Sequence, residues 1–85
     1  MINIEANGED ILLVNAGGSY YAIGNICTHM GCSLSEGTLN AESVQCPCHS
    51  ATFDLRTGAV MHGSATEPER VFKVTVNNDQ IFISM

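Results

Sequence analysis

Two short stretches of the chain concentrate side chains that bind soft metal ions. The first is Cys27-Thr28-His29-Met30-Gly31-Cys32, and the second is Cys46-Pro47-Cys48-His49-Ser50. Each contains a cysteine and a histidine at close spacing, as Cys-x-His in the first stretch and Cys-x-x-His in the second. Thiolate and neutral imidazole are both common ligands of iron and zinc. Each stretch can therefore offer one thiolate and one imidazole to a shared metal centre.

This alternation of ligand types differs from the order found in a zinc finger. A zinc finger takes its two cysteines from one segment and its two histidines from another, with the histidines about three to five residues apart. Here each segment mixes the two types. A structural zinc site stays open as an alternative, in which the metal only folds the chain and a protein partner binds its surface.

The two stretches resemble the cluster-binding loops of the Rieske iron-sulfur family. The resemblance rests on Cys27-Thr28-His29 with Gly31-Cys32 and on Cys46-Pro47-Cys48-His49, and it covers nearly the whole chain. It implies that Cys27 and Cys46 hold one iron of a two-iron, two-sulfur (2Fe-2S) cluster, while His29 and His49 hold the other. Because imidazole is neutral, such a cluster accepts an electron more readily than one held by four thiolates.

The resemblance gives the other two cysteines a separate role. Respiratory Rieske proteins carry a disulfide at the positions of Cys32 and Cys48, so a bridge that joins the two loops is implied here. Two buried thiols are the alternative, and a reducing compartment would favour them. A bridge would stabilise this short chain by about 3 kcal/mol in the chain-entropy description.

Two positions depart from the respiratory pattern. That branch has a serine two residues after the second ligand histidine and a tyrosine two residues further on, whose hydroxyls donate hydrogen bonds to cluster sulfur and to a ligand thiolate. This chain has Ala51 and Phe53 at these positions, and neither side chain can donate. We expect both residues to keep the potential in the lower part of the family range of about −150 to +300 mV.

The segments on either side of the loops read as short antiparallel strands. Alternating apolar residues, punctuated by Gly, Asn and Asp, predict one hairpin region before the loops and another after them. The first spans 2–23 with turns at Asn7-Gly8 and Gly17-Gly18, and the second pairs 72–76 with 80–84. We therefore expect an all-β fold, a Rieske-like antiparallel β sandwich or barrel. A small cluster-binding subdomain of loops, at about 27–63, would be inserted between the hairpins.

A few further residues in or near the loops carry weaker expectations. Gly31 and Gly37 are expected to hold loop conformations with positive φ. His62 is expected at the surface, because the resemblance already assigns four ligands. The acidic residues expected to contact a basic redox partner are Glu36, Glu67 and Glu69.

Length and charge limit the organisation and the partners of the chain. Its 85 residues allow one compact domain, 1–85, and nine Asp and Glu against three Lys and Arg give a net charge of −6. Nucleic acid and anionic membrane surfaces need clustered basic residues, which are lacking.

No apolar run approaches the roughly 20 residues that cross a bilayer, and the start lacks the features of a signal peptide. We expect a cytoplasmic protein with a basic protein partner.

The resemblance implies an electron carrier and not an enzyme. A Rieske-type ferredoxin passes single electrons from a reductase, here one with a basic docking face, to a terminal oxygenase or another redox acceptor. An oxygenase is excluded because its non-haem iron needs two more histidines and a carboxylate, and only His62 is left. A soluble domain of a respiratory Rieske protein is the alternative function, and a zinc-stabilised interaction module is a less favoured one.

Overall fold

The computed structural model describes residues 1–27, 31–48, 51–63 and 67–84 of the chain. Within these ranges the chain forms short β-strands and a single-turn 3-10 helix, η1. The elements are β1 Ile2–Ala6, β2 Glu9–Ala16, β3 Ser19–Gly24, η1 Leu34–Glu36, β4 Thr38–Asn40, β5 Ser43–Gln45, β6 Thr52–Asp54, β7 Val60–His62, β8 Val71–Asn77 and β9 Gln80–Ser84.

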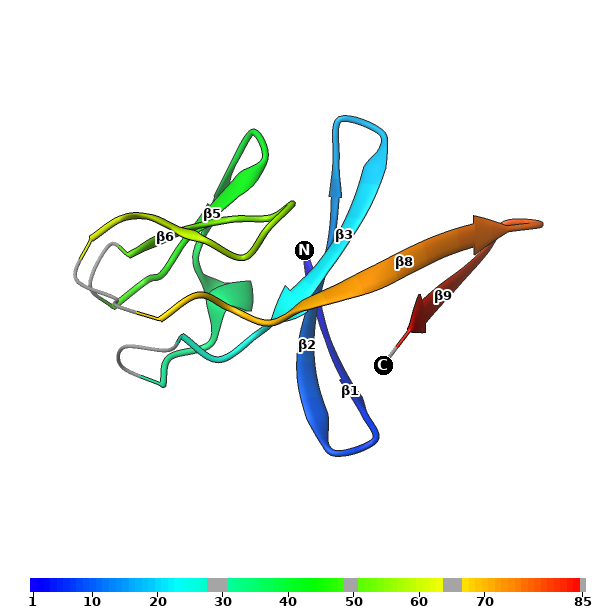
Figure 1. Cartoon of the computed structure of the whole chain (residues 1–85), viewed down its shortest axis with the longest axis horizontal. Coiled ribbons are helices and arrows are strands. Elements are labelled where there is room, and N and C mark those ends of the chain that lie inside the picture. Colours follow the sequence, from blue (N-terminus) through cyan, green and yellow to red (C-terminus); the bar gives the residue numbers. More distant parts are fainter. Residues whose placement is uncertain (28–30, 49–50, 64–66, 85) are drawn as a thin grey trace.

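The strands form two antiparallel sheets. The larger sheet has the order β1-β2-β3-β8-β9, and the smaller sheet has the order β4-β5-β6-β7. All strands of the smaller sheet come from the segment between β3 and β8, and in Figure 1 this sheet lies to one side of the larger one, opposite the β8–β9 hairpin. The prediction of an all-β, antiparallel fold is confirmed.

Two-residue turns set the register of the terminal hairpins. Asn7 and Gly8 have φ values of 52° and 78°, and Asn78 and Asp79 have values of 51° and 63°. Turns with positive φ at both central residues match the right-handed twist of the strands that they join, and Asn, Asp and Gly adopt them most easily. The residues that flank each turn are paired, Ala6 with Glu9 and Asn77 with Gln80. Both predicted hairpin regions are therefore confirmed.

Strand β2 is buried on both of its faces, which explains its continuous apolar run. Ile11 and Leu13 pack in one cluster with Ala22 and Phe72. Leu12, Val14 and Ala16 point the other way, into a second cluster. Because side chains alternate across a strand, a strand between two apolar layers needs apolar residues at successive positions.

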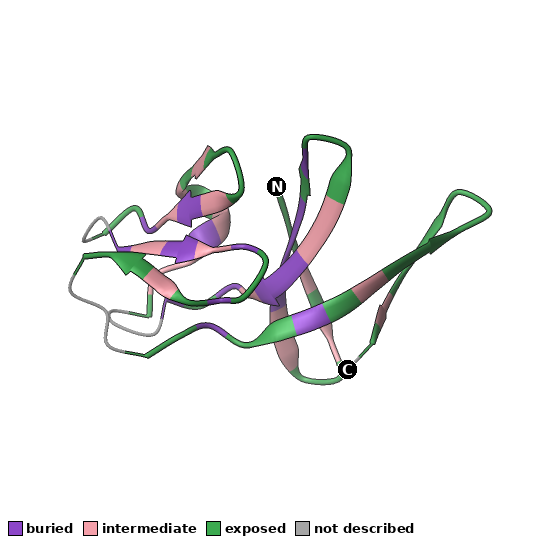
Figure 2. Cartoon of the chain, turned by 45° about the horizontal axis from the view of Figure 1, so that its top comes forward, coloured by how far each residue is buried: buried purple, intermediate pink, exposed green. Residues whose placement is uncertain are grey.

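The second cluster joins the two sheets and includes one cysteine from each of the two cysteine stretches, Cys27 and Cys46. Its members from the smaller sheet and the adjoining loops include Leu34, Val44, Phe53 and Leu55, and each of these side chains is fully buried. Figure 2 shows buried residues on the facing parts of the two sheets, whereas the β8–β9 hairpin is exposed over most of its length. The smaller sheet is thus held against β2 and β3 by apolar packing.

Candidate metal centre

The first cysteine stretch forms a loop closed by backbone hydrogen bonds. The Cys27 N–H donates to the carbonyl of Cys32 at 2.8 Å, and the Gly31 N–H donates to the carbonyl of Cys27 at 2.9 Å. One residue outward, Ile26 and Ser33 form an isolated antiparallel bridge. Both ends of the loop 27–32 are therefore held side by side.

The second stretch lies at the tip of the β5–β6 hairpin. The Cys46 N–H donates to the carbonyl of Ala51 at 2.7 Å, which continues the ladder that pairs Gln45 with Thr52. The loop 46–51 therefore begins where a regular hairpin ends.

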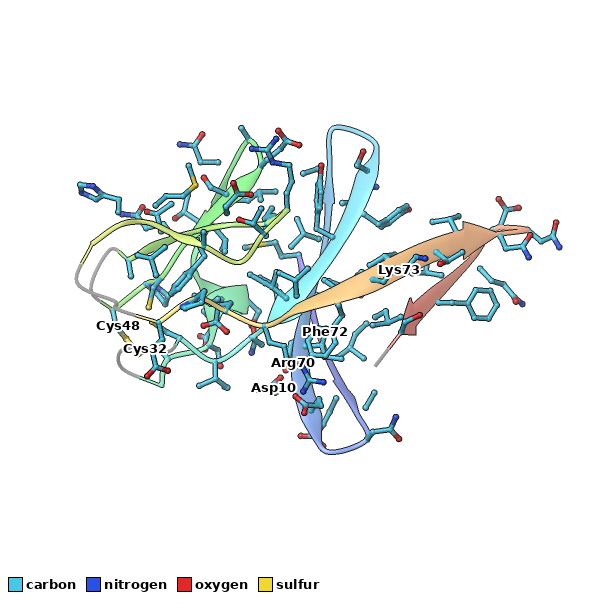
Figure 3. The ribbon with its side chains drawn as sticks, viewed as in Figure 1. Asp10, Cys32, Cys48, Arg70, Phe72 and Lys73 are labelled. Atoms are coloured by element: carbon cyan, nitrogen blue, oxygen red, sulfur yellow. A yellow bond between two sulfur atoms is a disulfide. The ribbon has the colours of Figure 1, made fainter. Side chains whose placement is uncertain are left out.

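A disulfide between Cys32 and Cys48 joins the two loops, with the Cα atoms 6.5 Å apart (Figure 3). Cys32 is half-buried and Cys48 is exposed, so the bridge lies toward the surface. Cys27 and Cys46 remain outside the disulfide, one in each loop, and each is only 2% exposed. The structure therefore separates the four cysteines into one bridge and two buried thiols.

The described part of the predicted ligand set fits a metal cluster that needs two thiolates. Cys27 and Cys46 both belong to the apolar cluster between the sheets, and the disulfide brings their loops together. His29 and His49, the other two predicted ligands, lie outside the described residues. Within the described ranges no group of three or more His, Cys, Asp or Glu side chains could hold a metal ion. The two thiols thus agree with half of the donor set that a 2Fe-2S cluster with mixed ligands requires.

Ala51 and Phe53, the predicted tuning residues, lie in the same apolar cluster as the two thiols. Both are fully buried. Neither side chain has a hydrogen-bond donor. Both residues therefore add apolar side chains to the cluster that contains the two thiols.

Two expectations for residues near the loops are wrong. Gly31 has a φ of +74°, as expected, but Gly37 has a φ of −86°. Gly37 is needed for space instead, because a Cβ atom there would lie 1.9 Å from the carbonyl oxygen of Gln45. Glu69 is only 6% exposed, so it is not an accessible docking residue, whereas Glu36 and Glu67 are exposed. His62 lies exposed on β7, as expected.

Charged and hydroxyl groups gather at the other end of the small sheet. The Arg56 N–H donates to Oδ1 of Asp54 at 2.7 Å, and this bond lowers the pKa of Asp54 below its ordinary value. The Tyr21 hydroxyl donates to Oε2 of Glu42 at 2.6 Å, which raises the pKa of Tyr21 because its deprotonation would place a second anion there. Ser43, beside Asp54 in the β5–β6 ladder, is at the end of β5 that lies away from loop 46–51. These groups are therefore not part of the metal centre.

Sequence reasoning missed one buried polar residue beside the first loop. Asn25 is fully buried, and it hydrogen-bonds to Asp10, Leu34 and Ser35. The available signal was an amide side chain two residues before the first cysteine, at the end of an apolar strand.

Comparison with known proteins relates the chain to small electron carriers. The Rieske [2Fe-2S] domain family matches residues 1–78. The "3-phenylpropionate/cinnamic acid dioxygenase ferredoxin subunit" of Escherichia coli (strain K12) is 42% identical over 76 residues, which are 88% of this chain and 72% of that protein. A ferredoxin component of "naphthalene 1,2-dioxygenase/salicylate 5-hydroxylase systems" from Ralstonia sp. is 29% identical over 85 residues, which are 100% of this chain and 82% of that protein.

Solved structures give the same relationship. The ferredoxin of carbazole 1,9a-dioxygenase from Nocardioides aromaticivorans IC177 superposes with a TM-score of 0.94 at 33% identity, over 98% of this chain and 82% of that one. A chain from a complex of reduced oxygenase and oxidized ferredoxin in carbazole 1,9a-dioxygenase superposes with a TM-score of 0.93 at 30% identity, over 98% and 86% of the two chains. Among the described residues, no helix is long and apolar enough to cross a membrane. With its two adjoining loops and their two buried thiols, the chain belongs to the Rieske [2Fe-2S] domain family, whose cofactor is the two-iron, two-sulfur cluster.

Proposed function

We propose that this chain is the ferredoxin component of a dioxygenase system, a one-electron carrier between a reductase and a terminal oxygenase. The observation that carries the proposal is the pairing of two closed loops, each with one buried thiol, through the Cys32–Cys48 disulfide. The dioxygenase ferredoxins to which the chain is similar support the choice of partners. The chain itself makes and breaks no substrate bonds.

We assign Cys27 and Cys46 to one iron of the cluster and His29 and His49 to the other. The cluster supplies a site that takes up and releases one electron. Cys27 and Cys46 come from the buried ends of their loops, so their thiolates would hold the inner iron away from water. Cys32 and Cys48 keep the loops together and take no part in metal binding.

We infer that Ala51 and Phe53 lower the potential relative to respiratory relatives. Their side chains are buried, and they offer no donor to a sulfur or thiolate that gains negative charge on reduction. The more negative state is therefore stabilised less than in a protein with hydroxyl groups at these positions.

For the partners, we propose a reductase with a basic docking face. The net charge of −6 favours such a partner. Two exposed carboxylates are candidate contacts: Glu36, in η1 after the first cysteine loop, and Glu67, in the segment before β8.

We further propose that residues 1–85 form a single domain located in the cytoplasm. Cell fractionation and a single cooperative unfolding transition are the measurements that check these two statements.

An electron-relay assay tests the function. The purified protein is combined with a dioxygenase reductase and its terminal oxygenase, and product formation is followed with and without the chain. We expect turnover that depends on the chain, and its loss in Cys27→Ser and Cys46→Ser. Cys32→Ser with Cys48→Ser is the matched cysteine control, which should keep most of the turnover while the cluster remains bound. Zinc in place of iron, or relay by the Cys27→Ser variant, would overturn the proposal.

A further inference from the structure

Asn25 connects the first metal-binding loop to the larger sheet. It lies directly after β3 and two residues before Cys27, and it is fully buried. A buried amide is costly unless its polar groups are hydrogen-bonded, so the partners of Asn25 indicate what holds it there.

Asn25 uses its backbone and its side chain in two directions. Toward β2, its N–H donates to the carbonyl of Asp10 at 2.9 Å, and its Nδ2 donates to Oδ2 of Asp10 at 3.4 Å. Toward η1, its carbonyl accepts from the Leu34 N–H at 2.7 Å, and its Oδ1 accepts from the Ser35 N–H at 2.9 Å. One residue therefore joins β2, the end of β3 and the start of η1.

The bonds to η1 replace a cap that the helix lacks. Ser33, the residue before η1, makes no side-chain hydrogen bond to the helix. The first N–H groups of a helix have no partner within the helix and need one from outside. Asn25 supplies acceptors for two of them, and it does so from across the loop.

This arrangement fixes both ends of the loop 27–32. Asn25 precedes the loop, and Leu34 and Ser35 follow it. Their hydrogen bonds are therefore the first in a series of pairings that run from the larger sheet toward the loop. The next two pairings are the Ile26–Ser33 bridge and the bond from Cys27 to Cys32. Leu34 is fully buried in the apolar cluster that contains both thiols, so the position of η1 affects the packing around them.

Asp10, which belongs to β2 and is labelled in Figure 3, anchors this series of pairings at its base. The Nδ2 of Asn3 also donates to the Asp10 carboxylate. The carboxylate is thus held from β1 while it accepts from Asn25.

We propose that Asn25 is a positioning residue for the metal centre: through Asp10 and η1, its amide sets the place of the Cys27 loop against the larger sheet. The inference rests on the proposed function, because it concerns a loop to which that function assigns a metal ligand. Removal of the amide would leave the Ser35 N–H without its acceptor and would loosen the loop at its base.

A reciprocal exchange separates this role from simple filling of space. Asn25→Ala removes both side-chain bonds. Asn25→Asp keeps an acceptor for Ser35 but places a second carboxylate beside Asp10, which costs free energy through like-charge repulsion. Asn25→Asp combined with Asp10→Asn restores a donor and an acceptor in reversed order, and the amide at position 10 can still accept from Asn3.

Two measurements on the protein as purified follow the effect. The first follows the cluster itself, through its rate of loss and through the line shape of its paramagnetic resonance signal after reduction. The second is hydrogen–deuterium exchange of the peptide that spans Cys27 to Leu34, which needs no cluster for its interpretation. Leu13→Ala, in the other apolar cluster, is the control for a general loss of stability.

We expect Asn25→Ala and Asn25→Asp to lose the cluster about tenfold faster than the wild type, as removal of outer-shell partners typically weakens metal binding. The loop peptide should exchange faster by a similar factor, and the exchanged pair should return to within about twofold of the wild type. Leu13→Ala should leave the line shape unchanged. Wild-type values in Asn25→Ala, or no recovery in the exchanged pair, would overturn the inference. If the wild type bound no cluster, the proposed function would fail, and peptide exchange would still decide whether Asn25 holds the loop.

Discussion

At the scale of residues, the proposed assignment of Cys27 and Cys46 to the cluster means that the surroundings of these two thiols set how easily the cluster is reduced. Cys27 and Cys46 are packed among apolar side chains that include Ala51 and Phe53. Apolar surroundings without donors disfavour the more negative, reduced state of a metal centre. The two tuning positions are therefore the places where single atoms should change the potential.

Ala51→Ser combined with Phe53→Tyr should raise the midpoint potential, because each change adds a hydroxyl donor to a buried position. A hydrogen bond to a charged group contributes about 1.5 kcal/mol or more, and a factor of ten in a one-electron equilibrium is about 59 mV. We expect a rise of the order of 100 mV in protein-film voltammetry, with about 65 mV from each hydroxyl.

Phe82→Tyr is the matched control for this change, because it adds the same hydroxyl to a side chain on β9 that is 50% exposed. It should leave the potential unchanged. A double variant with the wild-type potential would show that these positions do not tune the centre.

Asp54 should titrate below its ordinary value of 3.8, mainly because the Arg56 N–H donates to its carboxylate. A lowered pKa in the folded state means that Asp54 stabilises the fold above pH 3.8, and that this contribution disappears as the pH falls through the folded value. Arg56→Ala keeps the backbone N–H, so an NMR titration should show only a partial rise. A return to 3.8 would instead assign the shift to the guanidinium.

The errors at this scale have a common physical cause. Glu69 belongs to an acidic stretch, and its burial depends on packing of the 67–70 segment against Gly24 and Gly58, which no local pattern encodes. The loop position of Gly37 predicts a left-handed conformation, whereas a glycine is needed there because the Gln45 carbonyl leaves no room for a Cβ atom. Both properties depend on residues distant in the sequence.

At the scale of elements, the metal-binding loops are short continuations of hydrogen-bonded ladders. The Cys27–Cys32 and Cys46–Ala51 bonds close each loop at its base, and the disulfide joins the two loops near the surface. The terminal hairpins could be predicted because their alternation and their turn residues are local signals. The short strands β4 to β7 could not, because three residues are too few to show a period.

Removal of the bridge by Cys32→Ala with Cys48→Ala should lower the free energy of unfolding by about 3 kcal/mol, because the unfolded chain is no longer constrained over a separation of 16 residues. Urea unfolding followed by circular dichroism measures the change. Cluster loss should also become faster, since the loops would no longer be joined. Unchanged stability, together with alkylation of Cys32 and Cys48 in the unreduced wild type, would contradict the bridge.

Gly37→Ala should destabilise the turn between η1 and β4 by about 3 kcal/mol or more, since its Cβ would overlap the Gln45 carbonyl oxygen. Gly8→Ala is the control for conformational cost alone, because a Cβ at that position meets nothing within 4 Å while φ is +78°. We expect it to cost about 1 kcal/mol. Equal losses in the two variants, measured by thermal unfolding, would mean that close approach is not the reason for Gly37.

At the scale of the whole molecule, a small β framework holds one metal centre at its side. The smaller sheet packs on β2 and β3. Loop 27–32 follows the end of β3, and loop 46–51 connects β5 and β6 of the smaller sheet (Figure 1). Membership of the Rieske family could be predicted because its sequence motif depends on residue type and spacing alone. The connection through Asn25 was not, because it joins residues from three separate segments.

The central claim is that one thiolate and one imidazole from each loop hold a two-iron, two-sulfur cluster. Electron paramagnetic resonance of the dithionite-reduced protein, with pulsed detection of nitrogen coupling and with iron and sulfide analysis, tests it most directly. We predict a rhombic signal, about two irons and two sulfides per chain, and coupling to two imidazole nitrogens. A silent, zinc-containing protein, or a cluster without nitrogen coupling, would contradict the account.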